Sequence, residues 1–165
     1  MNPRPGRLLK ILFRMPLAFY RIGLGGFERL YGMHWILVTT RGRRTGKPHS
    51  VLVDIIDYDR PTDTYTVQPA FGRRADWVRN IEKTPIFEAQ VGRRHFRARA
   101  LPVEAEEGAE RMLRFIASHP VEWWMIGWML GVKPPAEAKS EEQMKSWLAR
   151  EFMFLGIRPV GHFPS

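Results

Sequence analysis

The chain has 165 residues, 44% of them hydrophobic, a formal net charge of +9 at pH 7 and no cysteine. This length and apolar content fit one compact domain, residues 1–165, and the lack of cysteine excludes disulfides, thiol nucleophiles and thiolate metal ligands. The five histidines lie far apart in the sequence, so we expect no metal site. The uncharged apolar stretches near the N-terminus are too short for a spanning helix or a signal peptide, which predicts a cytoplasmic protein.

The positive charge is concentrated in the first fifty residues. Residues 1–50 contain ten Lys and Arg and one acidic residue, Glu28, whereas residues 51–165 contain sixteen of each kind. An asymmetry of this kind indicates a localised anionic partner, which could be a membrane, a nucleic acid or a phosphorylated ligand.

Residues 1–31 are predicted to contain an amphipathic helix, over residues 7–31. At 100 degrees per residue, its charged side chains fall within roughly 60 degrees of one another and leave a broad apolar face. These side chains are Arg7, Lys10, Arg14, Arg21 and Glu28. Two interpretations stay open. The apolar face packs on its own domain or on a second subunit in a homodimer, or the helix lies in the inner surface of the cell membrane.

After this helix the pattern changes to the alternation that is typical of strands. Five strands are predicted, at residues 35–40, 49–59, 64–70, 86–92 and 94–103. Closely spaced antiparallel strands favour a barrel, whose core we place at residues 35–103. Between the third and fourth strands, residues 74–83 predict a short helix that begins near Asp76 and ends before Pro85.

Residues 104–165 are predicted to form a helical tail and a closing strand. The helical segments are expected at residues 106–119, 121–131 and 140–152, and the last apolar run, 152–160, could close the sheet. The fold class is therefore α+β, a β-barrel with an N-terminal amphipathic helix and helical C-terminal segments.

The turn between the first two strands, "RGRRTGKP", is rich in positive charge and glycine. It differs from a P-loop because three residues, not four, separate Gly42 from Gly46, and because Pro48 occupies the position of the magnesium-binding Ser or Thr. Two interpretations remain open, a generic phosphate clamp built from Arg and Lys and a solvated basic turn.

The tail contains a cluster of three tryptophans, Trp123, Trp124 and Trp128, at helical spacing. Such a cluster is typical of a core, but it could also form the wall of an apolar ligand pocket. The five serines lie outside any recognisable nucleophile motif, so a hydrolase is poorly supported.

Three segments in order resemble the deazaflavin (F420)-dependent nitroreductase family. They are "ILVTTRGRRTGKP", "YTVQPAFGRRADWVRNIEKTP" and "FEAQVGRRHFRARA". The resemblance extends over about residues 7–103, and it departs from the family pattern at Val78, where Tyr is usual, and at His49, where Arg is common.

The resemblance implies a split β-barrel of the FMN-binding and pyridoxamine-phosphate-oxidase-like type, holding a deazaflavin, coenzyme F420, whose phosphate and oligoglutamate tail are anionic. It places Arg43, Arg44, Thr45, Lys47 and His49 at the phosphate and tail. It places the backbone of Pro69, Ala70, Phe71 and Gly72 and the indole of Trp77 against the ring system, with Gly46, Asp76 and Asn80 also at the cofactor.

The resemblance further implies hydride transfer from the reduced cofactor to a small quinone, nitro compound or other conjugated acceptor, for which no side chain need be a catalytic acid or base. Trp123, Trp124 and Trp128 would then line the acceptor pocket. Two alternatives remain. One is an FMN-dependent reductase of the same fold. The other is a non-enzymatic basic module that binds anionic lipid or nucleic acid. No nucleic-acid-binding signature in the sequence supports binding of nucleic acid.

Overall fold

The structure is a computed structural model that describes residues 35–161, except 122, 125–126 and 128–130. The predicted helix at residues 7–31 and the predicted ligand contact of Trp128 lie outside the described residues. The described strands are β1 (Trp35–Arg41), β2 (Pro48–Asp59), β3 (Thr64–Val67), β4 (Ile86–Val91), β5 (Arg94–Pro102) and β6 (Leu155–Pro159). The described helices are α4 (Asp76–Lys83), α5 (Ala105–Ser118) and α7 (Glu141–Glu151), with a 3₁₀ turn, η2 (Gly72–Arg74).

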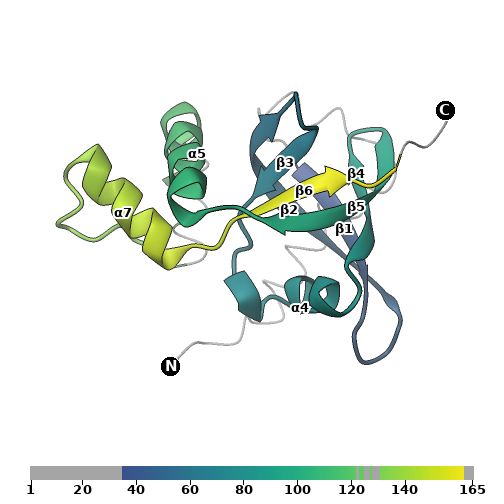
Figure 1. Cartoon of the computed structure of the whole chain (residues 1–165). Helices are drawn as coiled ribbons and strands as arrows, with labels where there is room; N and C mark the ends of the chain where they lie inside the picture. Colours follow the sequence, from purple (N-terminus) through teal and green to yellow (C-terminus); the bar gives the residue numbers. More distant parts are fainter. Residues whose placement is uncertain (1–34, 122, 125–126, 128–130, 162–165) are drawn as a thin grey trace.

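The six strands form a closed barrel in the order β1-β2-β3-β6-β5-β4, and every neighbouring pair is antiparallel. The helices α5 and α7 lie together on one side of the barrel, and α4 lies below it in Figure 1. This arrangement confirms the predicted α+β barrel with helical C-terminal segments.

The closing strand predicted from the tail is confirmed as β6. Ile157 pairs with Tyr65 of β3 on one side and with Ala100 of β5 on the other. The barrel therefore depends on a strand that follows the whole helical tail in sequence, and the yellow strand in Figure 1 lies between strands that precede that tail.

Two predicted boundaries were wrong. The third strand was expected to reach residue 70, but β3 ends at Val67, because Pro69 has no N–H to donate to a strand ladder and its carbonyl instead accepts from Gly72 N–H at 2.9 Å. The helix expected at residues 74–83 starts two residues later, at Asp76, because Ala75 has an extended backbone and Arg74 belongs to η2.

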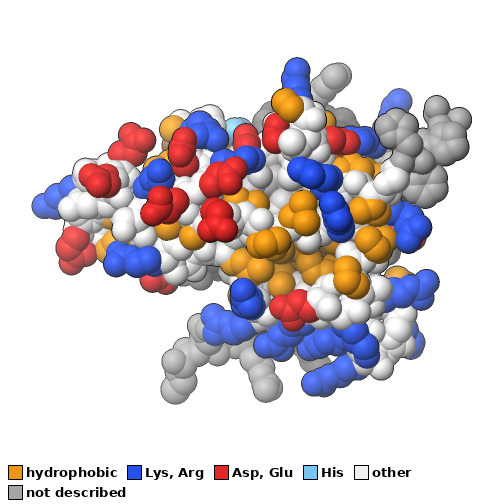
Figure 2. Space-filling view, in the orientation of Figure 1, with side chains coloured by type: hydrophobic (Ala, Val, Ile, Leu, Met, Phe, Trp, Pro, Cys, Tyr) orange, Lys and Arg blue, Asp and Glu red, His pale blue; other side chains and the backbone are white. Residues whose placement is uncertain are grey.

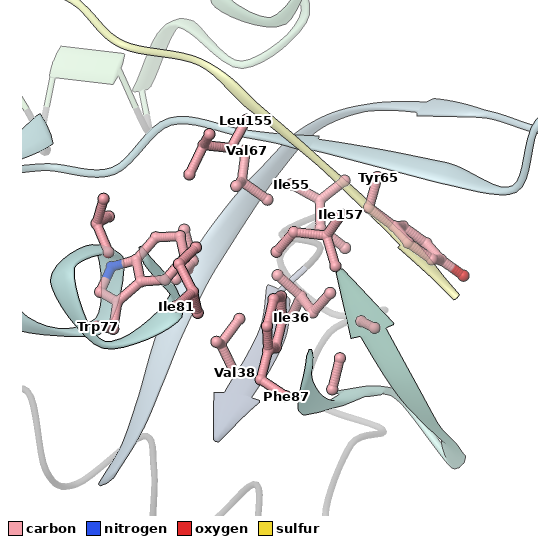
Figure 3. Packing of buried hydrophobic residues seen from close by; sticks show 14 of the residues in the cluster. Ile36, Val38, Ile55, Tyr65, Val67, Trp77, Ile81, Phe87, Leu155 and Ile157 are labelled. Carbon is pink, nitrogen blue, oxygen red and sulfur yellow. The ribbon is translucent and has the colours of Figure 1, made fainter. Parts of the chain in front are cut away.

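The barrel interior is a close-packed apolar core. Inward-facing side chains of all six strands contribute to it, and Ile36, Val67 and Ile157 are fully buried. From α4, Trp77 and Ile81 join the same cluster, and Figure 3 shows both projecting from the helix toward the strands. The helix α4 therefore covers one end of the barrel and is fixed there by its own apolar face.

A second apolar cluster joins the helical tail to the outside of the barrel. It contains Ile56 of β2, residues of α5 and α7, and Phe154 just before β6. Beside it, Arg111 of α5 donates to Asp57 Oδ2 at 2.8 Å and to Thr66 Oγ1 at 2.9 Å. The tail is thus held to β2 and β3 by both apolar packing and a charge-assisted network.

Gly108 lies at a close approach between α5 and the segment that leads into β6. A Cβ atom at Gly108 would lie 2.2 Å from Cδ2 of Phe154, which is 2% exposed. We predict that Gly108→Ala lowers the free energy of unfolding by about 1–3 kcal/mol, because the clash exceeds the gain in helix propensity of about 1 kcal/mol.

The measurement is urea unfolding of the full-length protein. Glu106→Ala, on the exposed side of the same helix, is the matched control and should change the free energy of unfolding by less than about 0.5 kcal/mol. A Gly108→Ala variant as stable as the wild type would show that α5 can move away from Phe154 without cost.

Candidate functional site

The basic loop, defined here as residues 42–47, joins β1 to β2 as a tight, hydrogen-bonded turn. Gly42 N–H donates to the carbonyl of Lys47 and Gly46 N–H donates to the carbonyl of Gly42, both at 2.8 Å. Gly46 has a φ of 67°, a left-handed conformation that favours glycine. The loop therefore has a defined backbone before any ligand is considered.

A buried amide on α4 holds this loop against the barrel. The side chain of Asn80, 3% exposed, accepts from Arg43 N–H at 3.1 Å and donates to Thr40 Oγ1 of β1 at 3.0 Å. Lys83, at the end of the same helix, donates to the Arg43 carbonyl at 3.0 Å. Both backbone polar groups of Arg43 are thus bonded to α4.

The guanidinium of Arg43 is also directed at α4. Its Nη1 donates to Asp76 Oδ1 at 2.9 Å and to Asn80 Oδ1 at 3.4 Å. The hydrogen bond from Arg43 is the main reason why the pKa of Asp76 is lowered, although partial burial acts in the opposite direction. Because the pKa is lowered, this pair persists as pH falls until the lowered pKa is reached.

A cavity of about 320 Å³ lies between the basic loop and α4. Its lining contains all five predicted phosphate and tail residues, together with Asp76 and Asn80. The lining residues are Gly42, Arg43, Arg44, Thr45, Lys47, Pro48, His49, Asp76 and Asn80. Figure 2 shows basic side chains gathered over and below α4, whereas acidic side chains gather over α5 and α7.

The cations of this cavity differ in what they contact. Arg43 is paired with Asp76, whereas Arg44 and Lys47 are exposed and form no ion pair with any of the described residues. His49, at the start of β2, is exposed beside them. Unpaired cations around one hollow suit a ligand with several anionic oxygens.

The residues predicted to contact a ring system are divided between two places. Pro69, Ala70, Phe71 and Gly72 form the loop after β3, where Phe71 is 54% exposed. Trp77 is 5% exposed and belongs to the barrel core, so its indole packs against protein in this structure (Figure 3).

A second, smaller cavity of about 40 Å³ lies between the barrel and the helical tail. Its described lining residues are Asp54, Ile56, Gln68, Ala70, Met112, Phe115, Trp123, Val132 and Phe152. Trp123 is half-buried here, with its ring edge toward Phe152 at a centroid separation of 6.5 Å. Trp124 is 71% exposed and lines neither cavity.

Sequence reasoning missed Asp54, the carboxylic acid of the second cavity. It is half-buried on β2, opposite Trp35 of β1. Burial raises the pKa of its carboxyl, and a hydrogen bond from Trp35 partly opposes this effect. The available signal was the acidic residue within the apolar run "SVLVDII". Burial of a carboxylate on a strand costs free energy, so an acid at such a position indicates a functional role.

Comparison with known proteins identifies one family. A family model described as F420H(2)-dependent quinone reductase matches residues 12–122. Among solved structures, the chain is similar to a protein described as "F420-H2 Dependent Reductase (FDR-A)", with 15% identity, a TM-score of 0.47 and coverage of 75% of this chain and 93% of that chain. No curated protein matches.

We predict that Asn80→Ala releases the basic loop. Removal of the amide leaves Arg43 N–H and Thr40 Oγ1 without their partner, so the free energy of unfolding should fall by about 1–3 kcal/mol. Hydrogen exchange at the Arg43 amide, measured by NMR, should become faster.

Thr40→Val is the matched control for this variant. It removes the hydroxyl that Asn80 donates to, but it leaves the bond between Asn80 Oδ1 and Arg43 N–H in place. Slow exchange at Arg43 in both variants would mean that Asn80 does not hold the loop.

Proposed function

The chain belongs to the F420H(2)-dependent quinone reductase family, and from this premise we propose that the basic loop binds the anionic part of F420 while the second cavity receives the acceptor. Family membership makes the protein an oxidoreductase that uses F420 and a small quinone-type acceptor. It also decides against the FMN-dependent and non-enzymatic interpretations that the sequence left open. Bound F420 supplies the hydride, and the protein supplies binding, orientation and an environment that excludes water.

The observation that carries this proposal is that two cations, Arg44 and Lys47, lie at one cavity beside a fixed backbone and form no ion pair with the described part of the chain. Phosphate and carboxylate oxygens match these donors, and Thr45 and His49 add further polar groups to the same lining. The residues present therefore fit the phosphate and glutamate tail of F420.

Arg43, Asp76 and Asn80 take a different part in this proposal. Their side chains form hydrogen bonds with one another and so position the loop. Arg43 also lines the cavity and adds to the positive charge there. A loop that is ordered before the ligand arrives loses less conformational entropy on binding than a mobile one.

One short stretch of chain contributes to both cavities. Gln68 and Ala70 line the second cavity, while Asp76 and Asn80, on the helix that follows, line the first. We therefore assign the ring system of F420 to the loop of Pro69 to Gly72. Trp77 would support that loop from the core, because its side chain is buried.

The acceptor is assigned to the second cavity because its walls are largely apolar. Trp123 and Phe152 of the tail and Met112 of α5 would contact a quinone ring there. The cavity is far smaller than the roughly 300 Å³ typical of ligand pockets, so binding requires the tail side chains to move apart. Of the predicted tryptophans, Trp123 is the one that lines this cavity among the described residues, so we assign this part of the wall to it.

We predict that Arg44→Ala and Lys47→Ala each weaken F420 binding at least about tenfold, because a charge-assisted hydrogen bond contributes about 1.5–3 kcal/mol. Fluorescence titration of the full-length protein with F420 measures the affinity, which should also fall as salt rises.

Arg93→Ala is the matched control, since Arg93 is an exposed arginine in the β4–β5 turn and lines neither cavity. The same titration with FMN should show weaker binding than F420. Equal F420 affinity in the wild type and both loop variants would contradict the proposed clamp, and preferential binding of FMN would contradict the proposed cofactor.

We further propose that residues 7–31 bring the enzyme to the inner face of the cell membrane, on its cytoplasmic side. The predicted helix would have basic residues on one face and apolar residues on the other, which suits a surface of anionic lipid, and quinones dissolve in the interior of such a membrane. Within the described ranges, none of the helices has the length and apolar character to cross a bilayer. A homodimer formed through the same segment is the competing proposal.

Vesicle flotation separates these two proposals. The full-length protein should float with vesicles of phosphatidylglycerol and phosphatidylcholine, float weakly with phosphatidylcholine alone, and remain at the bottom when residues 1–31 are deleted. A full-length protein that never floats, and that sediments as a dimer only when residues 1–31 are present, would assign the segment to a subunit interface.

A further inference from the structure

We infer that Asp54 is a catalytic residue that donates the proton which completes quinone reduction. The inference rests on the proposed function, since it takes the second cavity as the acceptor site. It adds a side-chain acid to a reaction for which the family resemblance required none.

The chemistry requires one proton at the acceptor. A quinone that receives a hydride gains two electrons and one hydrogen, and it becomes a neutral quinol only when one oxygen also gains a proton. The Asp54 carboxyl would break its O–H bond, protonate that oxygen and become a carboxylate. It regains a proton from solvent, and the proton released on oxidation of F420H₂ balances this uptake.

The position of Asp54 fits this role. Of the described residues that line the second cavity, Asp54 is the only ionisable one, and Gln68 is the only other with a polar side chain that can accept a hydrogen bond. Asp54 lines the cavity from β2, and Met112 and Phe115 line it from α5. A carboxyl surrounded in this way meets any ring that enters the cavity.

The surrounding charges leave the carboxyl uncompensated. Two cations of α5 are adjacent in sequence to cavity-lining residues, and both are already paired. Arg111 is bonded to Asp57, Thr66 and Glu107, and Arg114 is bonded to Glu110. His119, beyond the end of α5, stacks on Phe115 at a centroid separation of 4.7 Å and contacts Ser118 through Nδ1. Among the described residues Asp54 forms no ion pair.

These surroundings favour the protonated form of the acid. Burial raises the pKa of Asp54, and the opposing effect is the hydrogen bond from Trp35. A raised pKa increases the fraction of protonated carboxylic acid near neutral pH, which is the form that a proton donor needs. Reaction through this acid should therefore slow as pH rises through the pKa of Asp54.

Asp54 is also well separated from the basic loop. His49 pairs with Thr40 near one end of the β1–β2 pairing, and Asp54 pairs with Trp35 at the other end. Five residues of strand span about 17 Å, so the acid cannot be neutralised by Arg44 or Lys47 at close range.

The first test measures the acid directly, without cofactor. Carbon-13 NMR of the side-chain carboxyls in the full-length protein should show one Asp with a pKa well above the usual value of about 3.9, and this signal should be absent in Asp54→Asn. Trp35→Phe removes the indole donor and should raise the pKa of Asp54 further. An Asp54 carboxyl that titrates near the usual value would overturn the inference.

The second test is single-turnover oxidation of reduced F420 by menadione across a range of pH. Asp54→Asn should slow the reaction at least about 100-fold at neutral pH and abolish its decline at high pH, while the affinity for F420 stays unchanged. Asp59→Asn, the same substitution near the end of β2, is the control and should behave like the wild type.

A wild-type rate and pH dependence in Asp54→Asn would overturn the inference while leaving the proposed function intact. If instead the wild-type protein bound no F420, the proposed function would fail, and the assignment of Asp54 would fail with it.

Discussion

The site depends on the buried side chain of Asn80. Three arginines and a lysine within residues 41–47 repel one another, so the loop gains no order from its own charges. Asn80 offsets this repulsion, since one amide bonds to Arg43 N–H and to Thr40 Oγ1 of the adjoining strand. The amide is fixed in turn because Trp77 and Ile81 anchor its helix in the barrel core. Core packing is thereby coupled to the placement of surface cations.

The barrel and the tail supply different halves of the proposed chemistry. The barrel carries the cations of the first cavity, and the tail contributes most of the apolar wall of the second. The two halves cannot separate easily, because Arg111 bridges α5 to β2 and β3, and because β6 enters the barrel only after α7. Gly108 permits the close approach of α5 to Phe154 on which this junction rests.

The sequence predicted what local pattern can determine. Alternation located five strands, an apolar run suggested the closing sixth, and the charge and glycine content of residues 42–47 marked the basic loop. It could not determine that Trp77 turns into the core, because the same residue at the same helical position could face either a ligand or the barrel. It also missed Asp54, whose surroundings come from Met112, Trp123 and Phe152, far away in the chain. Burial of that kind exists only after the tail has folded back onto β2.

The distance between the two cavities has an electrostatic consequence. Transfer of a hydride to a neutral quinone creates negative charge at the acceptor, which must be stabilised or neutralised where it appears. At about 17 Å, with an effective dielectric constant near 20, one cation of the basic loop contributes only about 1 kcal/mol. The loop is therefore suited to the cofactor's anionic part but does little for charge that develops near Asp54, at the far end of the β1–β2 pairing. An acid beside the acceptor, whose protonated form is favoured by burial, would meet that requirement locally.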